Sequence, residues 1–148
     1  MREIAVEPYT TAEDALLLWA RGIAWPYPKA GGSTTVRLLS SLETSRAKHA
    51  PVEVTSATLA VAAGTQQVSV PAGSFEVRVR TARLSDGTLR RYYVENAAPY
   101  RILKWETSTG EHAELLGSDR MKYWELNFEG GEQGLKRMGL SRRAPRMT

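Results

Sequence analysis

Apolar and polar positions alternate most clearly between residues 68 and 80 of this chain. Pro71 and Gly73 interrupt the run near its start, because proline cannot donate a ladder hydrogen bond and glycine reaches backbone angles that other residues avoid. After this break the apolar side chains share one side of an extended chain, and the charged side chains share the other. The apolar set is Phe75, Val77 and Val79, and the charged set is Glu76, Arg78 and Arg80. This pattern predicts a half-buried antiparallel strand with one side in solvent.

Short runs of the same kind follow one another from Thr34 to about residue 128. Turn residues separate them, and Asp86-Gly87 between two such runs is a strong hairpin signal. The strands are expected at residues 34–42, 52–55, 58–63, 66–70, 75–83, 88–95, 100–107 and 111–116, with 121–128 as a final candidate. No helical pattern alternates with these runs, so the sequence disfavours a parallel sheet. We therefore predict an all-β fold, a curled antiparallel meander that forms a closed or half-open β-barrel.

One N-terminal helix is expected before the strands, from Thr11 to Arg21. Threonine suits its start, Glu13 and Asp14 suit its positive end, and Gly22 suits its exit. Its apolar residues recur at helical spacing, which predicts packing against the core. These residues are Ala15, Leu16, Leu18 and Trp19.

The length of 148 residues fits one domain. We expect this domain to span residues 1–134, with a glycine-rich stretch joining it to a basic tail at residues 135–148. The tail holds five of the chain's 20 basic residues and no acidic residue, so the remainder carries 15 basic against 16 acidic residues. Such a tail can meet an anionic surface, such as a membrane, or a nucleic acid, although a solvated terminus is the better account of it.

The chain has no cysteine, which excludes disulfides and thiolate metal sites. No apolar run approaches the roughly 20 residues that cross a bilayer. The first residues include Glu3 and Glu7 and lack the apolar core of a secretory signal. We therefore expect a cytoplasmic protein, or an exported one whose signal has been removed.

Two histidines are the first candidates for chemistry, since histidine titrates near neutral pH. His112 lies two positions before Glu114, so both side chains would share one side of a strand. Together they could begin a metal site or an acid–base pair, with His49 as a further catalytic candidate. Because no third ligand stands out, and because cross-strand pairing explains the same spacing, we expect no metal and no cofactor.

Aromatic residues are spread over most of the expected elements. In a curled sheet those that face inward could line an apolar pocket, although a filled core is the better account of any single residue. The wall and rim residues expected for such a pocket are Trp25, Tyr27, Phe75, Val77, Val79, Leu103 and Trp105.

A basic, partly aromatic outer face is also expected on neighbouring strands. It would contain Arg78, Arg80, Arg90 and Tyr92. Such a face can bind single-stranded nucleic acid by stacking and charge. Glu76 and Glu95 dilute it, which disfavours nucleic acid as a partner.

The run from Val68 to Phe75 resembles a bacterial family of β-domains of unknown function. Its members carry a V-x-V-P-A-G-x-F break, a hairpin, and an apolar Y-x-L-[VL]-[KR]-[WY]-E strand, which Tyr100 to Glu106 resembles here. The match spans Val52 to Leu116. It implies an antiparallel, incomplete or closed barrel related in shape to lipocalin-like and lipid-carrier proteins, in an exported setting in the bacterial envelope or periplasm. The family supplies no catalytic residues.

These observations favour a binding module, in which a curled sheet holds an apolar or amphipathic small molecule or lipid and the N-terminal helix lies against one opening. A hydrolase that uses a histidine or carboxylate base in the same pocket is the first alternative. An envelope structural or interaction protein that docks through the basic tail is the second. The sequence specifies neither the ligand nor the oligomeric state.

Overall fold

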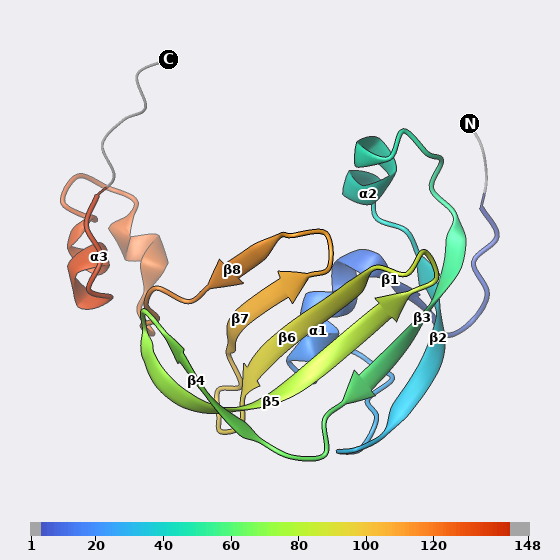
Figure 1. Cartoon of the computed structure of the whole chain (residues 1–148). Helices are drawn as coiled ribbons and strands as arrows, with labels where there is room; N and C mark the ends of the chain where they lie inside the picture. Colours follow the sequence, from blue (N-terminus) through green and yellow to red (C-terminus); the bar gives the residue numbers. More distant parts are fainter. Residues whose placement is uncertain (1–3, 143–148) are drawn as a thin grey trace.

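A curved sheet dominates the computed structural model, which describes residues 4–142 (Figure 1). Its eight strands are β1 (Thr10–Ala12), β2 (Ser33–Leu39), β3 (Val54–Val61), β4 (Gln66–Val70), β5 (Gly73–Leu84), β6 (Leu89–Glu95), β7 (Ile102–Thr107) and β8 (His112–Glu114). The order across the sheet is β1-β2-β3-β5-β6-β7-β8, and β4 pairs with β5 beyond the end of β3. Neighbours are antiparallel except β1 and β2. The predicted antiparallel sheet is confirmed, but β1 and β8 remain its two edges and no closed barrel forms.

Short helices flank the sheet: η1 (Glu13–Ala15), α1 (Leu16–Ala20), α2 (Leu42–Ala47), η2 (Tyr123–Leu126) and α3 (Gln133–Arg137). The helix predicted over residues 11–21 begins at Glu13, because residues 10–12 pair with β2 as an edge strand. Helix α2 begins where the alternation predicted the end of a strand, and Ser41 caps it by accepting the backbone N–H of Thr44 at 2.9 Å. The strand predicted at 121–128 is wrong, because the chain leaves the sheet after β8 and forms η2 instead.

The concave side of the sheet holds the main core, and α1 lies within this curve (Figure 1). Trp19 is fully buried there, with its ring edge-on to Tyr92 at a centroid distance of 6.5 Å. Its indole N–H donates to the Pro26 carbonyl at 2.8 Å, which satisfies the polar edge of the ring. The other buried members of this cluster are Leu16, Ala20, Val36, Leu38, Ala57, Leu59, Ala82, Leu84 and Val94.

The opposite side of the sheet carries a smaller apolar cluster near the β4–β5 hairpin. It consists of Val70, Val77 and Leu103, with Val68, Ala72, Phe75, Tyr93 and Leu115 packed against them. β5 therefore has buried side chains on both sides. Of the residues predicted to face solvent, Glu76 is exposed and Arg80 is buried. Arg80 is 7% exposed, donates to the carbonyl of Ala20, and lies with its guanidinium 4.7 Å from the centre of the Tyr27 ring.

The basic outer face predicted from the arginines of β5 and β6 is also wrong, because these residues point to the side that α1 covers. Arg78 donates to the carbonyl of Ala62 at 3.0 Å, and Arg90 pairs with Glu13. Tyr92 is buried in the main core. The guanidinium groups of Arg78 and Arg90 thus donate to a backbone carbonyl and to a carboxylate of the protein itself.

A β-bulge in β7 changes which side its residues face. The register shifts at Tyr93 and Val94, so that Leu103 is an extra residue without a partner on β6. Leu103 consequently joins the cluster near β4, whereas Ile102 and Trp105 pack against the main core. Strict alternation would place Leu103 and Trp105 together, and the bulge makes that expectation wrong.

Residues 117–142 follow β8 and fold back on themselves beyond one end of β4 (Figure 1). Arg137 Nε lies 2.7 Å from a carboxylate oxygen of Asp119, which ties α3 to the start of this segment. The predicted boundary after residue 134 falls inside α3, and residues 143–148 of the basic tail lie outside the described residues. Among residues 4–142, no helix is long and apolar enough to cross a membrane.

Candidate ligand-binding site

A cavity of about 450 Å³ opens at one end of the sheet, between η1–α1, α2 and the turns that follow β5 and β7. Its apolar wall consists of Leu16, Leu17, Leu84, Tyr92 and Trp105. Its charged residues are Glu13, Asp14, Glu43, Asp86 and Glu111, with Lys48 and Arg90 as the basic ones. The remaining lining residues are Ser41, Thr44, Ala47, Thr88, Thr107 and Thr109. We call this space the Glu13 cavity.

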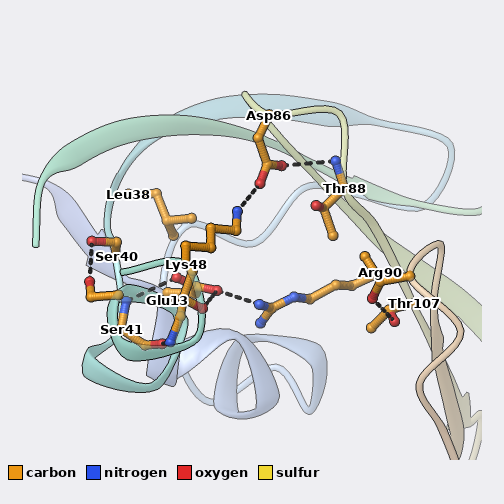
Figure 2. Close-up of polar contacts among 12 residues, drawn as sticks. Glu13, Leu38, Ser40, Ser41, Lys48, Asp86, Thr88, Arg90 and Thr107 are labelled. Carbon is orange, nitrogen blue, oxygen red and sulfur yellow. Dashed lines mark hydrogen bonds and ion pairs between the residues drawn. The ribbon is translucent and has the colours of Figure 1, made fainter. Parts of the chain in front are cut away.

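Glu13 joins three elements at the wall of this cavity (Figure 2). It is 3% exposed, and its Oε2 accepts the backbone N–H of Ser41 at 2.9 Å. Its Oε1 accepts the hydroxyl of Thr44 at 2.8 Å and the guanidinium of Arg90. A carboxylate can be buried when such donors replace its water shell. These bonds therefore fix η1 against the start of α2 and against β6.

Arg90 projects from β6 into the same wall, two residues before Tyr92. Its Nη2 donates to Glu13, while its buried Nε has no hydrogen-bond partner among residues 4–142. Burial raises the pKa of Tyr92, and the adjacent Arg90 guanidinium opposes part of this rise. Tyr92 is therefore a neutral phenol at physiological pH and contributes an aromatic ring to the cavity.

Lys48 and Asp86 form an ion pair that links the end of α2 to the β5–β6 turn (Figure 2). The hydrogen bond from Lys48 is the main cause that lowers the pKa of Asp86 to about 2, and the backbone N–H of Thr88, at 2.9 Å, adds to it. Both charged side chains are partly exposed, so water screens the pair. The pair lines the cavity and contributes little to the stability of the fold.

Three more carboxylates line the cavity: Asp14, Glu43 and Glu111. All three are exposed, and none of them forms an ion pair within residues 4–142. The lining as a whole therefore holds five acidic side chains against two basic ones. A concave surface with this imbalance concentrates positively charged groups.

The lining of the Glu13 cavity contains neither histidine nor cysteine. The hydroxyl of Ser41 is engaged as the cap of α2, so it is not paired with a base as an activated nucleophile would be. Within the described part of the chain, no group of three histidine, cysteine, aspartate or glutamate side chains could hold a metal ion.

The seven residues predicted to line a pocket lie in separate places. Trp105 lines the Glu13 cavity. Trp25 and Tyr27 are exposed after the end of α1, where the Trp25 ring lies 5.4 Å from that of Tyr9. The residues on the opposite side of the sheet, in or beside the smaller cluster, are Phe75, Val77, Val79 and Leu103.

The three catalytic candidates lie outside the Glu13 cavity. His112 and Glu114 are exposed on β8, where they stand opposite Glu106 and Lys104 of β7. His49 is exposed after α2, with a positive φ of 50°. The Glu13 cavity therefore contains carboxylates but none of these three residues.

The sequence did not predict the ion pair between Glu13 and Arg90. Glu13 is explained at the sequence level as a favourable charge in the first turn of a helix. Arg90 is one of several alternating arginines, and 77 positions separate the two residues. A single sequence carries no signal that pairs them, although Ser41 before Glu43 is a recognisable helix start.

No protein-family model, curated protein or solved structure matches the chain. The resemblance to the bacterial β-domain family stays a prediction. The function is therefore argued from the geometry of the site.

Proposed function

We propose that the protein binds a small amphipathic molecule that carries a positive charge, such as an organic amine, in the Glu13 cavity. The observation that carries this proposal is an apolar, partly aromatic wall beneath a surplus of carboxylates in one cavity of about 450 Å³. Ligand sites commonly have volumes of about 300–1,000 Å³. The sequence also favours a binding module, but the pocket proposed here shares only Trp105 with the residues predicted to line it.

The apolar part of the ligand would rest on Leu16, Leu84 and Trp105. Burial of roughly 150 Å² of apolar surface contributes about 4 kcal/mol, at about 25 cal/mol per Å². Loss of translational and rotational freedom offsets much of this gain. Burial alone therefore supports weak binding, and polar contacts must supply the remainder.

The positive charge of the ligand would lie near Asp14, Glu43 and Glu111, which have no basic partner in the described residues. A cation placed over the face of Trp105, which is partly exposed, gains a further contribution of about 0.5–2 kcal/mol. An anion of the same shape would be repelled by the same carboxylates. Charge should thus decide which amphipathic molecules bind.

Isothermal titration calorimetry with three ligands of one carbon skeleton tests this proposal: 3-phenylpropylamine, 3-phenylpropanol and 3-phenylpropanoate. We expect the amine to bind at least about tenfold more tightly than the carboxylate, with the alcohol between them. Equal affinity for all three compounds, or no binding of the amine, would refute the charge preference or the site.

Two sets of variants locate the binding. Ala47→Trp fills the cavity and should abolish amine binding, whereas Ala62→Trp, at an exposed alanine outside the lining, should not. The triple variant Asp14→Asn, Glu43→Gln, Glu111→Gln should weaken the amine about tenfold and leave the alcohol unchanged. A matched triple variant outside the cavity is Glu114→Gln, Glu129→Gln, Glu132→Gln, and it should bind as the wild type does.

A further inference from the structure

A second hollow lies between the C-terminal end of α1, the β6–β7 turn and the chain that follows β8. Its volume is about 570 Å³, and it shares no lining residue with the Glu13 cavity. The charged residues of its lining are Arg21, Arg101, Asp119 and Arg120, and we call it the Arg21 groove. Three of these residues are basic and one is acidic, so its charge is opposite to that of the Glu13 cavity.

The β6–β7 turn holds Arg21 in this groove. Arg21 directly follows α1, and its Nε donates to the carbonyl of Tyr100 and its Nη2 to the carbonyl of Pro99, both at 3.3 Å. No carboxylate of residues 4–142 pairs with Arg21, and its Nη1 has no acceptor among them. Because a guanidinium carries five N–H donors, Arg21 keeps donors for a ligand beside these two contacts.

Arg120 is the second arginine of the groove without a carboxylate partner among residues 4–142. Helix α3 fixes the chain that carries it, because Arg137 Nε lies 2.7 Å from Oδ2 of Asp119. Oδ1 of Asp119 accepts the backbone N–H of Arg120, also at 2.7 Å. A Cβ at Gly117 would overlap the carbonyl oxygen of Met138, so the end of α3 also packs closely against this stretch.

The other two charges of the lining have partners outside it. Arg101 binds Glu95 through two hydrogen bonds, from Nε at 2.9 Å and from Nη2 at 2.8 Å. Arg137 offsets the charge of Asp119. The guanidinium groups of Arg21 and Arg120 are thus left without a counter-ion among residues 4–142. Two like charges in one hollow repel each other, and an anion between them relieves this repulsion.

We propose that the Arg21 groove binds a small organic phosphate monoester, with the phosphate between Arg21 and Arg120. A phosphate monoester carries a charge of about −1.5 to −2 at pH 7, which matches these two guanidinium groups. The planar fork of arginine also fits phosphate oxygens through paired hydrogen bonds. The organic part would rest on Pro99, Ile102 and Leu115, the apolar residues of the lining.

The lining favours a small phosphate over a nucleic-acid strand. Single strands bind where successive bases stack on aromatic rings along a basic groove. Among residues 4–142, no aromatic side chain lines the Arg21 groove. Its volume of about 570 Å³ lies within the range of about 300–1,000 Å³ that is common for small-molecule sites.

Isothermal titration calorimetry with phenyl phosphate, phenyl sulfate and inorganic phosphate tests this proposal at about pH 7.5, where the phosphates are mostly doubly charged. We expect phenyl phosphate to bind at least about tenfold more tightly than phenyl sulfate, which has the same shape and one negative charge. Inorganic phosphate lacks the ring and should bind more weakly than phenyl phosphate. Equal affinity for phenyl phosphate and phenyl sulfate, or no binding of phenyl phosphate, would overturn the proposal.

A pair of arginine variants locates the phosphate. Arg21→Gln with Arg120→Gln should weaken phenyl phosphate binding at least about tenfold. Arg46→Gln with Arg83→Gln removes the same charge from two exposed arginines outside the groove, and it should change the affinity by less than about twofold. Circular dichroism melts that match the wild type show that each variant is folded. Equal losses in the two double variants would contradict the assigned site.

Ser118 allows a second test that keeps all the arginines of the lining. It is exposed in the groove, and Ser118→Glu adds a carboxylate there. This variant should weaken phenyl phosphate about tenfold, whereas the neutral Ser118→Gln should bind as the wild type does. Equal effects of the two substitutions would show that charge in the groove does not govern binding.

This proposal and the proposed amine site can fail separately. Figure 1 places the β6–β7 turn, which lines the groove, and α2, which lines the Glu13 cavity, at opposite ends of β6. Ala47→Trp should therefore leave phenyl phosphate binding unchanged, and Arg21→Gln with Arg120→Gln should leave 3-phenylpropylamine binding unchanged. Loss of phenyl phosphate binding in Ala47→Trp would place the phosphate in the Glu13 cavity and overturn the assignment to the groove.

Discussion

Glu13 and Arg90 form an ion pair in the wall of the Glu13 cavity, in which Glu13 is buried and Arg90 is partly exposed. Its contribution can be tested one residue at a time. Loss of one partner leaves the other charge buried without compensation, which typically costs about 3–5 kcal/mol. We expect Arg90→Met to lower the free energy of unfolding by about 3 kcal/mol, measured by urea denaturation. Glu13 would keep its bonds to Ser41 and Thr44, so the loss should lie at the lower end of that range.

Arg91 provides a matched control on the same strand. Its Nη1 lies 3.4 Å from a Glu106 oxygen, and both side chains are partly exposed. Arg91→Met should therefore change the free energy of unfolding by less than about 1 kcal/mol. If Arg91→Met and Arg90→Met destabilised the protein equally, burial would not explain the effect.

The ion pair between Asp86 and Lys48 predicts a pH dependence. The pKa of Asp86 falls from 3.8 to about 2 in the folded protein, so folding favours its ionised form. The resulting stabilisation is present above pH 3.8 and is lost as the pH falls towards 2. Partial exposure of both side chains keeps the effect small.

Asp86→Asn removes this dependence. We expect the variant to be less stable than the wild type at pH 6, and the difference to shrink below pH 4 and vanish near pH 2. Denaturant unfolding at a series of pH values measures it. A difference that stayed constant from pH 6 to pH 2 would show that Asp86 acts through a contact that does not depend on its charge.

Helix α2 is held mainly by polar contacts, and this predicts that it opens locally. Among its residues only Ser45 is buried, and Leu42 is largely exposed. Its links to the body are Thr44 with Glu13 and Lys48 with Asp86. Local opening is easiest where little apolar surface is buried.

Native-state hydrogen exchange measures this opening. We expect the α2 amides to exchange at least about tenfold faster than those in the centres of β5 and β6. Ser41→Ala removes the cap bond to Thr44 and should speed exchange in α2 by about fivefold, which corresponds to about 1 kcal/mol. Ser69→Ala, at an exposed serine of β4, is the control and should leave α2 unchanged. Equal protection of α2 and β5 would contradict this account.

Elements with a strong local pattern could be predicted from the sequence. Alternation in β5 and the Asp86-Gly87 turn gave that hairpin nearly correctly, since turn chemistry and side-chain period are local properties. Tertiary packing determined the features that the sequence did not predict. Arg80 alternates like a solvent residue, yet α1 covers it. The bulge at Leu103 leaves no trace in the spacing of apolar residues.

The candidate site was less predictable than the sheet, because it combines elements that are distant in the sequence. Trp105 was the one predicted pocket residue that lines the Glu13 cavity. Aromatic content suggested it, but the same argument also selected Phe75, which faces the other side of the sheet. Which side a strand residue faces depends on register, and register is fixed only when the strands pair.

The whole molecule is an open sheet with two distinct ends. β1 runs parallel to β2 and ends the sheet on one side, and β8 ends it on the other. An open sheet must cover its concave side, and here the short α1 fills only part of that space. The Glu13 cavity lies between α1, α2 and the β5–β6 turn. Residues 117–142 extend beyond β8.

This arrangement predicts that changes in the C-terminal segment do not affect ligand binding in the Glu13 cavity. Substitutions at well-separated sites without shared partners have additive effects, within about 0.5 kcal/mol. Trp124→Ser with Phe128→Ser should therefore leave the affinity for 3-phenylpropylamine unchanged within about twofold. Titration calorimetry on this variant measures the affinity. A change in amine affinity of tenfold or more would show coupling between the two ends, and the open sheet between them would then have to transmit it.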